Sequence, residues 1–316
     1  MNEDEPRPKA IDVTISKRKP EWLRIRRQGG ADYNEVKRLL RTADLNTVCE
    51  SANCPNRGEC FGSRTATFLL MGSNCTRHCT FCNIPGGPVA ILDPEEPRRV
   101  AETVRQLGLK FAVVTSVTRD DLPDGGAAHF AAVIDRIRSL NPGCGIEVLI
   151  PDFQGSEEAL ETVLNAAPEV LNHNLETVPR LYKALRPEAD YQRSLRLLAR
   201  ARSGSDAASR IIRIKTGIMV GVGETQEEVI DLMKDAVDSG VQILTIGQYL
   251  QPGPRHHPVL RFVEPAEFDE LAEIGRGLGL EWVESGPLVR SSYHAREQSE
   301  SLVQSPQRTV DDPAGN

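Results

Sequence analysis

The chain has 316 residues, of which 39% are hydrophobic and 26% charged, and its formal net charge is −7. This length permits one large domain or two modest ones. The acidic balance argues against nucleic acid as the main partner, because phosphate binding requires a basic surface. The N-terminal sequence MNEDEPRPKA lacks the apolar run of a secretory signal, and no stretch approaches the length of a transmembrane helix. We therefore expect a cytoplasmic protein without membrane association, whose thiols stay reduced.

Residues 1–30 are expected to be irregular, because they combine proline, charge and the Gly29-Gly30 pair. A basic stretch at residues 17–27 surrounds Trp22. We interpret this stretch as a solvated arm, with a docking site for an acidic protein partner as the alternative. A short helix is predicted over residues 33–40, because apolar side chains recur there on one face.

From residue 66 onward the pattern alternates between short apolar strands and amphipathic helices. Strands are predicted at residues 67–71, 110–117, 145–150, 169–173, 211–220 and 242–249. Helices are predicted at residues 93–107, 127–140, 156–165, 190–202, 225–239 and 265–278. Residues 203–210 are interpreted as a flexible surface loop, and the tail at 299–316 is expected to be disordered.

Strands that alternate with helices predict right-handed βαβ units and a parallel sheet. The six predicted strands are fewer than the eight of a full (β/α)8 barrel. A doubly wound sheet has the same local pattern, so periodicity alone leaves both architectures open. In either architecture, reactive groups are expected at the C-terminal ends of the strands.

Six of the seven cysteines form two triads. Cys49, Cys54 and Cys60 are spaced C-x4-C-x5-C, in a predicted loop, and Cys75, Cys79 and Cys82 are spaced C-x3-C-x2-C, directly after the first predicted strand of the alternating region. Clustered cysteines in a reducing compartment indicate metal binding.

Three thiolates per triad fit a [4Fe–4S] cluster with one iron left open. A structural zinc site would need four nitrogen or sulfur ligands, and only His78 lies beside the second triad. A cysteine-lined helix face is a further alternative. The seventh cysteine, Cys144, lies between two glycines before a strand and is interpreted as structural.

The second triad, within CTRHCTFC, resembles the C-x3-C-x-aromatic-C motif of the radical S-adenosylmethionine (SAM) superfamily. The upstream triad in TVCESANCPN-x3-C and the stretches TSVTRDDLPDGGA, HNLETVPRLY, GVGET and RSSYHA narrow the resemblance to the lipoyl synthase family, over residues 21–296. The resemblance implies a partial (β/α)6 barrel of the radical SAM type at residues 66–280. An N-terminal extension at 1–65 would carry the first triad, and a C-terminal extension at 281–298 would carry the RSSY motif.

The resemblance also implies residue roles. Cys75, Cys79 and Cys82 would hold the cluster that binds SAM, whereas Cys49, Cys54 and Cys60 would hold an auxiliary [4Fe–4S] cluster. Ser292 would be the fourth ligand of that auxiliary cluster. Six polar or glycine positions are candidates for SAM contacts, with ordinary loop and turn roles as the alternative: Asn172, Asn174, Glu176, Gly221, Gly223 and Glu224.

The implied reaction inserts two sulfur atoms at C6 and C8 of a protein-bound octanoyl group. These carbons carry unactivated C–H bonds that no side-chain base can deprotonate, so a cofactor-derived radical is required. The resemblance implies that the auxiliary cluster is consumed as the sulfur source. Its implied partners are octanoylated carrier domains of dehydrogenase acyltransferases and of the glycine cleavage H protein, an electron donor and a cluster-repair protein. A biotin-synthase-like enzyme and a zinc-stabilised binding protein are the alternative functions.

Overall fold

A computed structural model describes residues 18–25, 29–207 and 211–298. Its strands are β1 (Asn46–Thr47), β2 (Thr67–Leu70), β3 (Phe111–Ser116), β4 (Gly145–Leu149), β5 (Val170–Asn172), β6 (Arg213–Val220), β7 (Ile243–Gln248) and β8 (Trp282–Gly286). Its α-helices are α1 (Ala31–Thr42), α2 (Val48–Ser51), α3 (Arg57–Gly62), α4 (Glu96–Leu107), α5 (Ala127–Leu140), α6 (Glu157–Asn165), α7 (Tyr182–Leu185), α8 (Tyr191–Ala207), α9 (Gln226–Asp238) and α10 (Pro265–Gly277). Three short 3-10 helices complete the set: η1 (Glu21–Leu23), η2 (Phe153–Gly155) and η3 (Pro179–Leu181).

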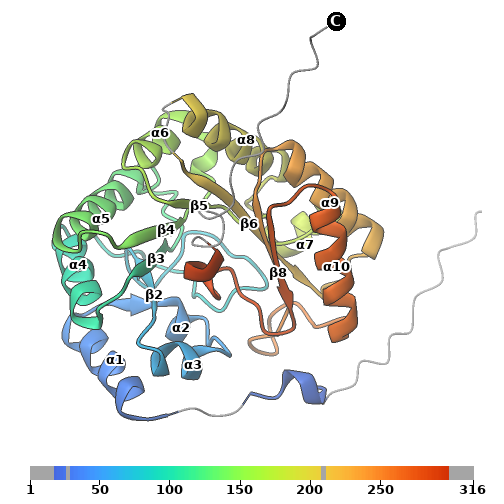
Figure 1. Ribbon diagram of the computed structural model, residues 1–316, viewed down its shortest axis with the longest axis horizontal. Helices are drawn as coiled ribbons and strands as arrows, with labels where there is room; N and C mark the ends of the chain where they lie inside the picture. Colours follow the sequence, from blue (N-terminus) through green and yellow to red (C-terminus); the bar gives the residue numbers. More distant parts are fainter. Residues whose placement is uncertain (1–17, 26–28, 208–210, 299–316) are drawn as a thin grey trace, which may run out of the picture.

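The strands form one sheet in sequential order from β1 to β8, in which β2 to β8 are parallel and β1 runs antiparallel to β2. In Figure 1 the sheet curves around an interior, with α4, α5, α6, α8, α9 and α10 on its outer face. Among the described residues, no pairing joins β8 back to β1. The structure therefore confirms an open, partial barrel.

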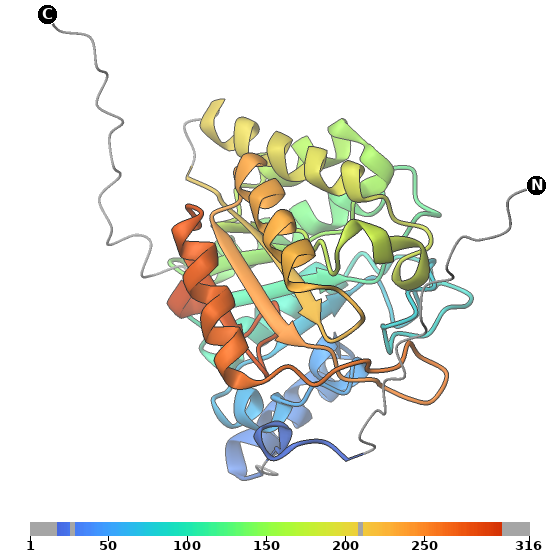
Figure 2. The same ribbon diagram turned by 90° about the vertical axis from the view of Figure 1, so that its right-hand side faces the viewer.

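Local sequence explains where several helices begin. The Thr225 hydroxyl accepts a hydrogen bond from the backbone of Glu228, whose carboxylate accepts one from the Thr225 backbone, and this capping box starts α9. Ser156 caps α6 by a single bond, since its hydroxyl accepts from the backbone amide of Ala159. Figure 2 shows α9 and α10 outside β6 and β7. Their buried residues include Val229 and Leu232 of α9 and Phe268 and Leu271 of α10.

Several predicted boundaries were wrong. The helix predicted from residue 93 begins at Glu96, because the Asp93 carboxylate instead caps the preceding turn through the backbone of Glu95. Residues 203–207, predicted as loop, continue α8, while 208–210 lie outside the described part. The first triad, also predicted in a loop, is carried partly by the short helices α2 and α3.

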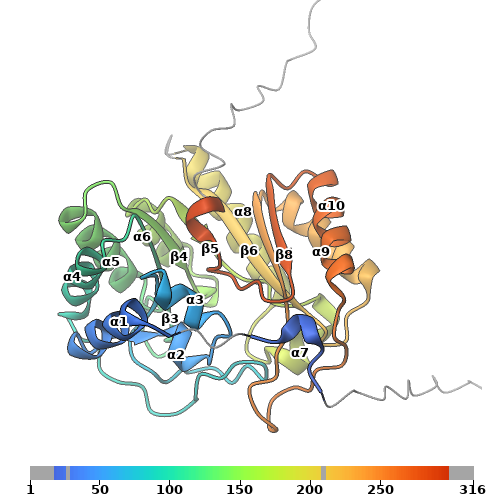
Figure 3. The same ribbon diagram turned by 60° about the horizontal axis from the view of Figure 1, so that its bottom comes forward.

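The predicted strand set lacked β1 and β8, which the two terminal segments add to the sheet. The division into two extensions and a barrel stays a prediction, and the tail at 299–316 lies outside the described residues. Figure 3 shows α1, α2 and α3 together beside β2 and β3, and α1 packs against α3 and α4. Within the described ranges, no helix has both the length and the apolar character to span a membrane.

The C-terminal segment after β8 turns back into the interior of the sheet (Figure 1). It passes so close to β7 that a Cβ on Gly247 would lie 2.2 Å from the carbonyl oxygen of Val289. Glycine at this strand position therefore makes room for the incoming backbone. This close approach brings the RSSY motif, residues 290–293, into the interior.

Candidate functional site

A cavity of about 820 Å³ opens at the C-terminal ends of the parallel strands. Its size lies in the upper range of small-molecule sites. The loops after β2, β3, β4, β5 and β7 contribute to its walls, as do α2 and the C-terminal segment. Five of the six predicted cysteine ligands line it, namely Cys49, Cys54, Cys75, Cys79 and Cys82. The structure thus brings the two triads to one cavity.

The second triad lies on the irregular loop directly after β2, as the sequence predicted. The Cys75 sulfur accepts hydrogen bonds from the backbone amides of Arg77 (3.4 Å) and Thr118 (3.3 Å). The Cys82 sulfur accepts one from the backbone amide of Ile84 at 3.4 Å. Such amide donors favour thiolate over thiol and tune an iron–sulfur cluster.

A buried ion-pair network anchors this loop. The Arg77 guanidinium donates two hydrogen bonds to Asp120, at 2.6 and 2.9 Å, and one to Asp152 at 2.6 Å. Arg193 of α8 donates to the other oxygen of Asp152 at 2.8 Å. Burial alone would raise the pKa of Asp152, but Arg77 outweighs it and holds that pKa well below its usual range. The loop is therefore fixed to the ends of β3 and β4 by charge.

The first triad is divided between two helices. Cys49 lies in α2, Cys60 lies in α3, and Cys54 lies between them. Cys60 does not line the cavity, although its thiol lies close enough to interact electrostatically with Cys49 and Cys54. The Asn83 amide after the second triad donates to the carbonyl of Ser51 at 2.7 Å. This bond joins the two cysteine regions directly.

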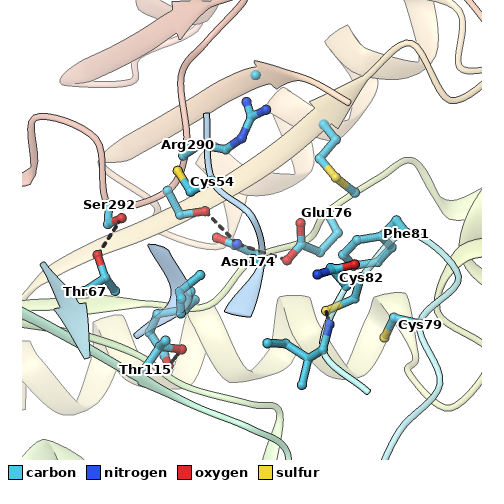
Figure 4. Close-up of a pocket in the computed structure, with 18 of the residues that line it drawn as sticks. Cys54, Thr67, Cys79, Phe81, Cys82, Thr115, Asn174, Glu176, Arg290 and Ser292 are labelled. Atoms are coloured by element: carbon cyan, nitrogen blue, oxygen red, sulfur yellow. Dashed lines mark hydrogen bonds between the residues drawn. The ribbon is translucent and has the colours of Figure 1, made fainter. Parts of the chain in front are cut away.

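The C-terminal segment closes the first triad from the opposite end of the chain. The Asn56 amide donates to the carbonyl of Leu288 at 2.7 Å, and the Tyr293 hydroxyl donates to Glu59 at 3.1 Å. The Ser292 hydroxyl accepts a hydrogen bond from Thr67 at 2.9 Å (Figure 4). Ser292 therefore lies at the start of β2, in the same cavity that Cys49 and Cys54 line.

Burial, with a smaller contribution from the neighbouring thiols, raises the pKa of Cys49 to about 11 and that of Cys60 to about 12. Burial likewise raises the pKa of Cys79 to about 11 and that of Cys82 to about 12. These thiols will not ionise together at neutral pH without added positive charge. Iron would supply that charge, so the donor set fits two clusters.

Within the described residues, no three His, Cys, Asp or Glu side chains are close enough to hold a single metal ion between them. A four-iron cube spreads its thiolates over separate corners, so the donor chemistry is the relevant test. Arg290 lies beside Cys54, and its positive charge favours the thiolate form of that cysteine. Burial lowers the pKa of Arg290, and Cys54 opposes that shift. A half-buried cation beside a cysteine of the first triad suits an anionic cluster.

Two of the predicted SAM-binding residues line the cavity next to the second triad. Asn174 donates to Glu176 at 3.0 Å and to Ser291 at 2.8 Å. Burial raises the pKa of Glu176, against the opposing charge of Arg186. Among the described atoms, the buried Asn174 Oδ1 and Arg186 Nε have no hydrogen-bond partner. A ligand that carries an ammonium and a carboxylate, as SAM does, would satisfy both.

The other predicted SAM contacts do not reach this cavity. Asn172 is fully buried in β5 and donates to Glu147 at 3.3 Å. The Glu224 carboxylate turns back to accept from the amides of Gly221 and Val222, and Gly223 is also absent from the cavity lining. The GxGE turn therefore has a structural role as a tight βα connection. A SAM contact of these four residues is not supported by the geometry.

Sequence reasoning missed several charged residues that face the interior. Glu147 of β4 lines the cavity and pairs with Lys215 of β6, whose Nζ lies 3.0 Å from each carboxylate oxygen. The available signal was a charged residue inside an apolar parallel strand, which is rarely tolerated unpaired. No local sequence pattern indicated that Arg186 would line the cavity, because its place there depends on how distant segments pack together. Cys144 is buried outside the cavity lining, as its structural interpretation predicted.

Comparisons with known proteins identify the family of the chain. The family model described as "Radical SAM superfamily" matches residues 69–236. The chain is 56% identical to a lipoyl synthase of Caldanaerobacter subterraneus subsp. tengcongensis over 278 residues, which cover 88% of this chain and 96% of the relative. It is 52% identical to a lipoyl synthase of Koribacter versatilis, with coverage of 94% and 98%.

Solved structures with a similar fold are far more distant in sequence. Streptococcus suis SuiB bound to S-adenosylmethionine superposes with a TM-score of 0.54 at 12% identity, covering 79% of this chain and 60% of that one. HydG, a maturase of the [FeFe]-hydrogenase, superposes with a TM-score of 0.53 at 15% identity, covering 85% and 75%. At these identities the likeness shows the fold alone.

Proposed function

The chain belongs to the lipoyl synthase family of the radical SAM superfamily, and from that premise we propose that its two triads hold two [4Fe–4S] clusters with separate roles. The family's reaction makes the chain a sulfurtransferase that acts with SAM and an iron–sulfur cluster. The observation that carries the proposal is the convergence of five of the six triad cysteines and Ser292 on one cavity. A biotin-synthase-like enzyme and a zinc protein are both disfavoured by this convergence together with the family.

Cys75, Cys79 and Cys82 would hold the cluster that binds SAM. When bound there, that cluster supplies the electron for reductive cleavage of SAM, which yields an oxidant able to remove hydrogen from an unactivated C–H bond. Asn174, Glu176 and Arg186 would orient SAM through its charged groups. Phe81 also lines the cavity and would keep water from the cluster.

Cys49, Cys54, Cys60 and Ser292 would hold the auxiliary cluster, which would be the sulfur donor. A serine oxygen is a harder ligand than a thiolate and suits iron less well. The corner at Ser292 would therefore open most easily. Arg290 would offset the negative charge of this cluster.

The test uses reduced, reconstituted protein with SAM and an octanoylated carrier-domain peptide. Two clusters predict about eight irons per chain and sulfur insertion into the peptide. Ser292→Ala should abolish most sulfur insertion while SAM is still cleaved, because the triad of Cys75 would be intact. Ser285→Ala is the control, because this hydroxyl of β8 donates to the Phe268 carbonyl and does not line the cavity. Full lipoyl formation by Ser292→Ala would reject the ligand role.

We further propose that the basic arm contacts the carrier protein. Lys19 and Ile25 line the mouth of the cavity, and Trp22 beside them is 39% exposed. Residues 17 and 26–28 lie outside the described part. Replacing Arg18, Lys19 and Arg24 by Glu should raise the KM for an acidic carrier domain several-fold and leave the kcat unchanged, since charged rims act mainly on encounter. An unchanged KM, also at low salt, would show that the arm is only solvated.

A further inference from the structure

We propose that Thr67 is a positioning residue that holds Ser292, and not its neighbour Ser291, against the first cysteine triad. The proposal rests on the proposed role of Ser292 as a cluster ligand. It adds the means by which the fold selects one of two adjacent, chemically identical hydroxyls.

Thr67 is the first residue of β2 and only 7% exposed. Its hydroxyl donates to the Ser292 oxygen across 225 positions of the chain, and the two side chains point toward each other in Figure 4. Thr47 of β1 pairs with Phe68 of β2, so Thr67 lies beside Cys49, where it opposes the burial that raises the pKa of that thiol. One residue thus lies next to both a cysteine of the triad and the serine that would complete it.

Ser291 has a different partner, on the side of the cavity that carries Asn174. Its hydroxyl accepts a hydrogen bond from the Asn174 amide at 2.8 Å, beside Glu176 and the second triad. The space there is tight, because a Cβ on Gly217 of β6 would lie 3.2 Å from the Ser291 oxygen. The two hydroxyls are therefore held in different positions by separate hydrogen-bond donors, Asn174 for Ser291 and Thr67 for Ser292.

The chemistry gives Thr67 a defined effect. A ligand that binds iron only weakly gains most from being held in place, because little of its binding energy is then lost to ordering. A hydrogen bond donated to the serine oxygen also stabilises its negative charge when it is deprotonated. Valine has the shape of threonine but no donor. A hydrogen bond of ordinary strength corresponds to about a 2- to 10-fold change in an equilibrium.

The experiment measures iron release from the first triad to a ferrous chelator under anaerobic conditions. Cys75, Cys79 and Cys82 are replaced by Ala, so that only the first triad carries iron. Thr67→Val should release iron about 2- to 10-fold faster, and Thr67→Ser should restore the original rate. Thr115→Val is the matched control: this threonine lies on the neighbouring strand β3 and lines the same cavity, but its hydroxyl donates to the Leu149 carbonyl. It should leave the rate unchanged.

A double-mutant cycle separates positioning from general damage. In a Ser292→Ala background, Thr67→Val should have no further effect. An equal effect in that background, or an equal effect of Thr115→Val, overturns the proposal, because the change would then act through Cys49 or through the fold. A second readout is the Mössbauer signal of the auxiliary-cluster iron that Ser292 would bind, measured in the protein with both clusters. This signal should change in Thr67→Val and stay the same in Thr115→Val.

The two proposals fail in different ways. Iron that is retained by the first triad equally well with threonine or valine at position 67 rejects the role of Thr67 only. A folded first-triad protein that takes up no iron and sulfide rejects the auxiliary cluster, and the role of Thr67 with it.

Discussion

The two cysteine triads share one cavity but are built in opposite ways. The second triad occupies a single loop after β2, within eight residues of sequence from Cys75 to Cys82. The first is split over α2 and α3, and its closing contacts come from the C-terminal segment, more than 200 positions away, as in the bond from Asn56 to Leu288. A local loop can be formed before the barrel is complete, whereas the first site needs both ends of the chain in place.

This contrast matches the proposed chemistry. A cluster that returns unchanged after each turnover benefits from a rigid loop, here fixed by the pairs of Arg77 with Asp120 and Asp152. A cluster that is consumed must open, and a site closed by a separate segment can do so without disturbing the barrel. If the two regions are independent, damage can be confined to one of them at a time.

The largest expected effect is complete loss of activity by two distinct routes. Cys79→Ala should abolish SAM cleavage, because the cluster that binds SAM would be missing. Cys54→Ala should abolish sulfur insertion but preserve SAM cleavage. Each variant should retain about four irons per chain. Product analysis by mass spectrometry checks both, and loss of SAM cleavage in a folded Cys54→Ala protein would contradict the separation of roles.

A backbone change at β7 should disable the first region only. In Gly247→Ala the new methyl would meet the Val289 carbonyl at 2.2 Å and push the C-terminal segment away. Sulfur insertion should fall about 100-fold, as expected for an ångström-scale misplacement, while SAM cleavage persists. Gly277→Ala is the control, since a Cβ there has nothing within 4 Å. Equal losses of both activities in Gly247→Ala would mean that the segment also supports the second triad.

Acid should lower the free energy of unfolding through His173, which lines the cavity at the end of β5. His173 is buried, with its ring nitrogens bonded to the Ile150 carbonyl and the Ser194 hydroxyl, and burial lowers its pKa from 6.5 to about 4. Between these values the unfolded chain binds the proton that the folded chain excludes, so stability falls as pH decreases from 6.5 toward 4. At pH 5 the loss is about 2 kcal/mol.

Denaturant unfolding of the apoprotein at pH 7.5 and pH 5 measures this loss. His173→Gln removes the titrating group and keeps a hydrogen-bonding side chain, so its stability should depend less on pH by the same amount. An identical pH dependence in the variant would assign the acid sensitivity to another group.

The smallest effect is expected from weakening the ion pairs that fix the loop after β2, which carries the second triad. Arg77→Lys keeps the charge but loses the paired donors that grip Asp120 and Asp152. Supporting contacts of this kind are worth about 10-fold in metal affinity or activity, so SAM cleavage should fall by that factor. Iron bound at the first triad should be unaffected. A matching loss of iron from the first triad would show that the two regions are coupled.

Local patterns predicted most of the barrel. The helix at Ala127–Leu140 was predicted with both boundaries correct, because its apolar face and flanking turns are read within one segment. The strand β8 was missed because Trp282–Gly286 is only partly buried and polar at Glu284 and Ser285. Its strand conformation is decided by pairing with β7, which no local pattern records.

The amino-acid sequence by itself determined the number and spacing of the cysteines in the two triads, since these are covalent properties of the chain. It also determined the alternation of strands and helices, since this depends on local periodicity. Only the tertiary structure decided that Gly221, Gly223 and Glu224 lie away from the cavity and that Arg186 lines it. It also decided that the Ser291 hydroxyl pairs with Asn174 and the Ser292 hydroxyl with Thr67, because the curved sheet brings these distant partners to the C-terminal segment.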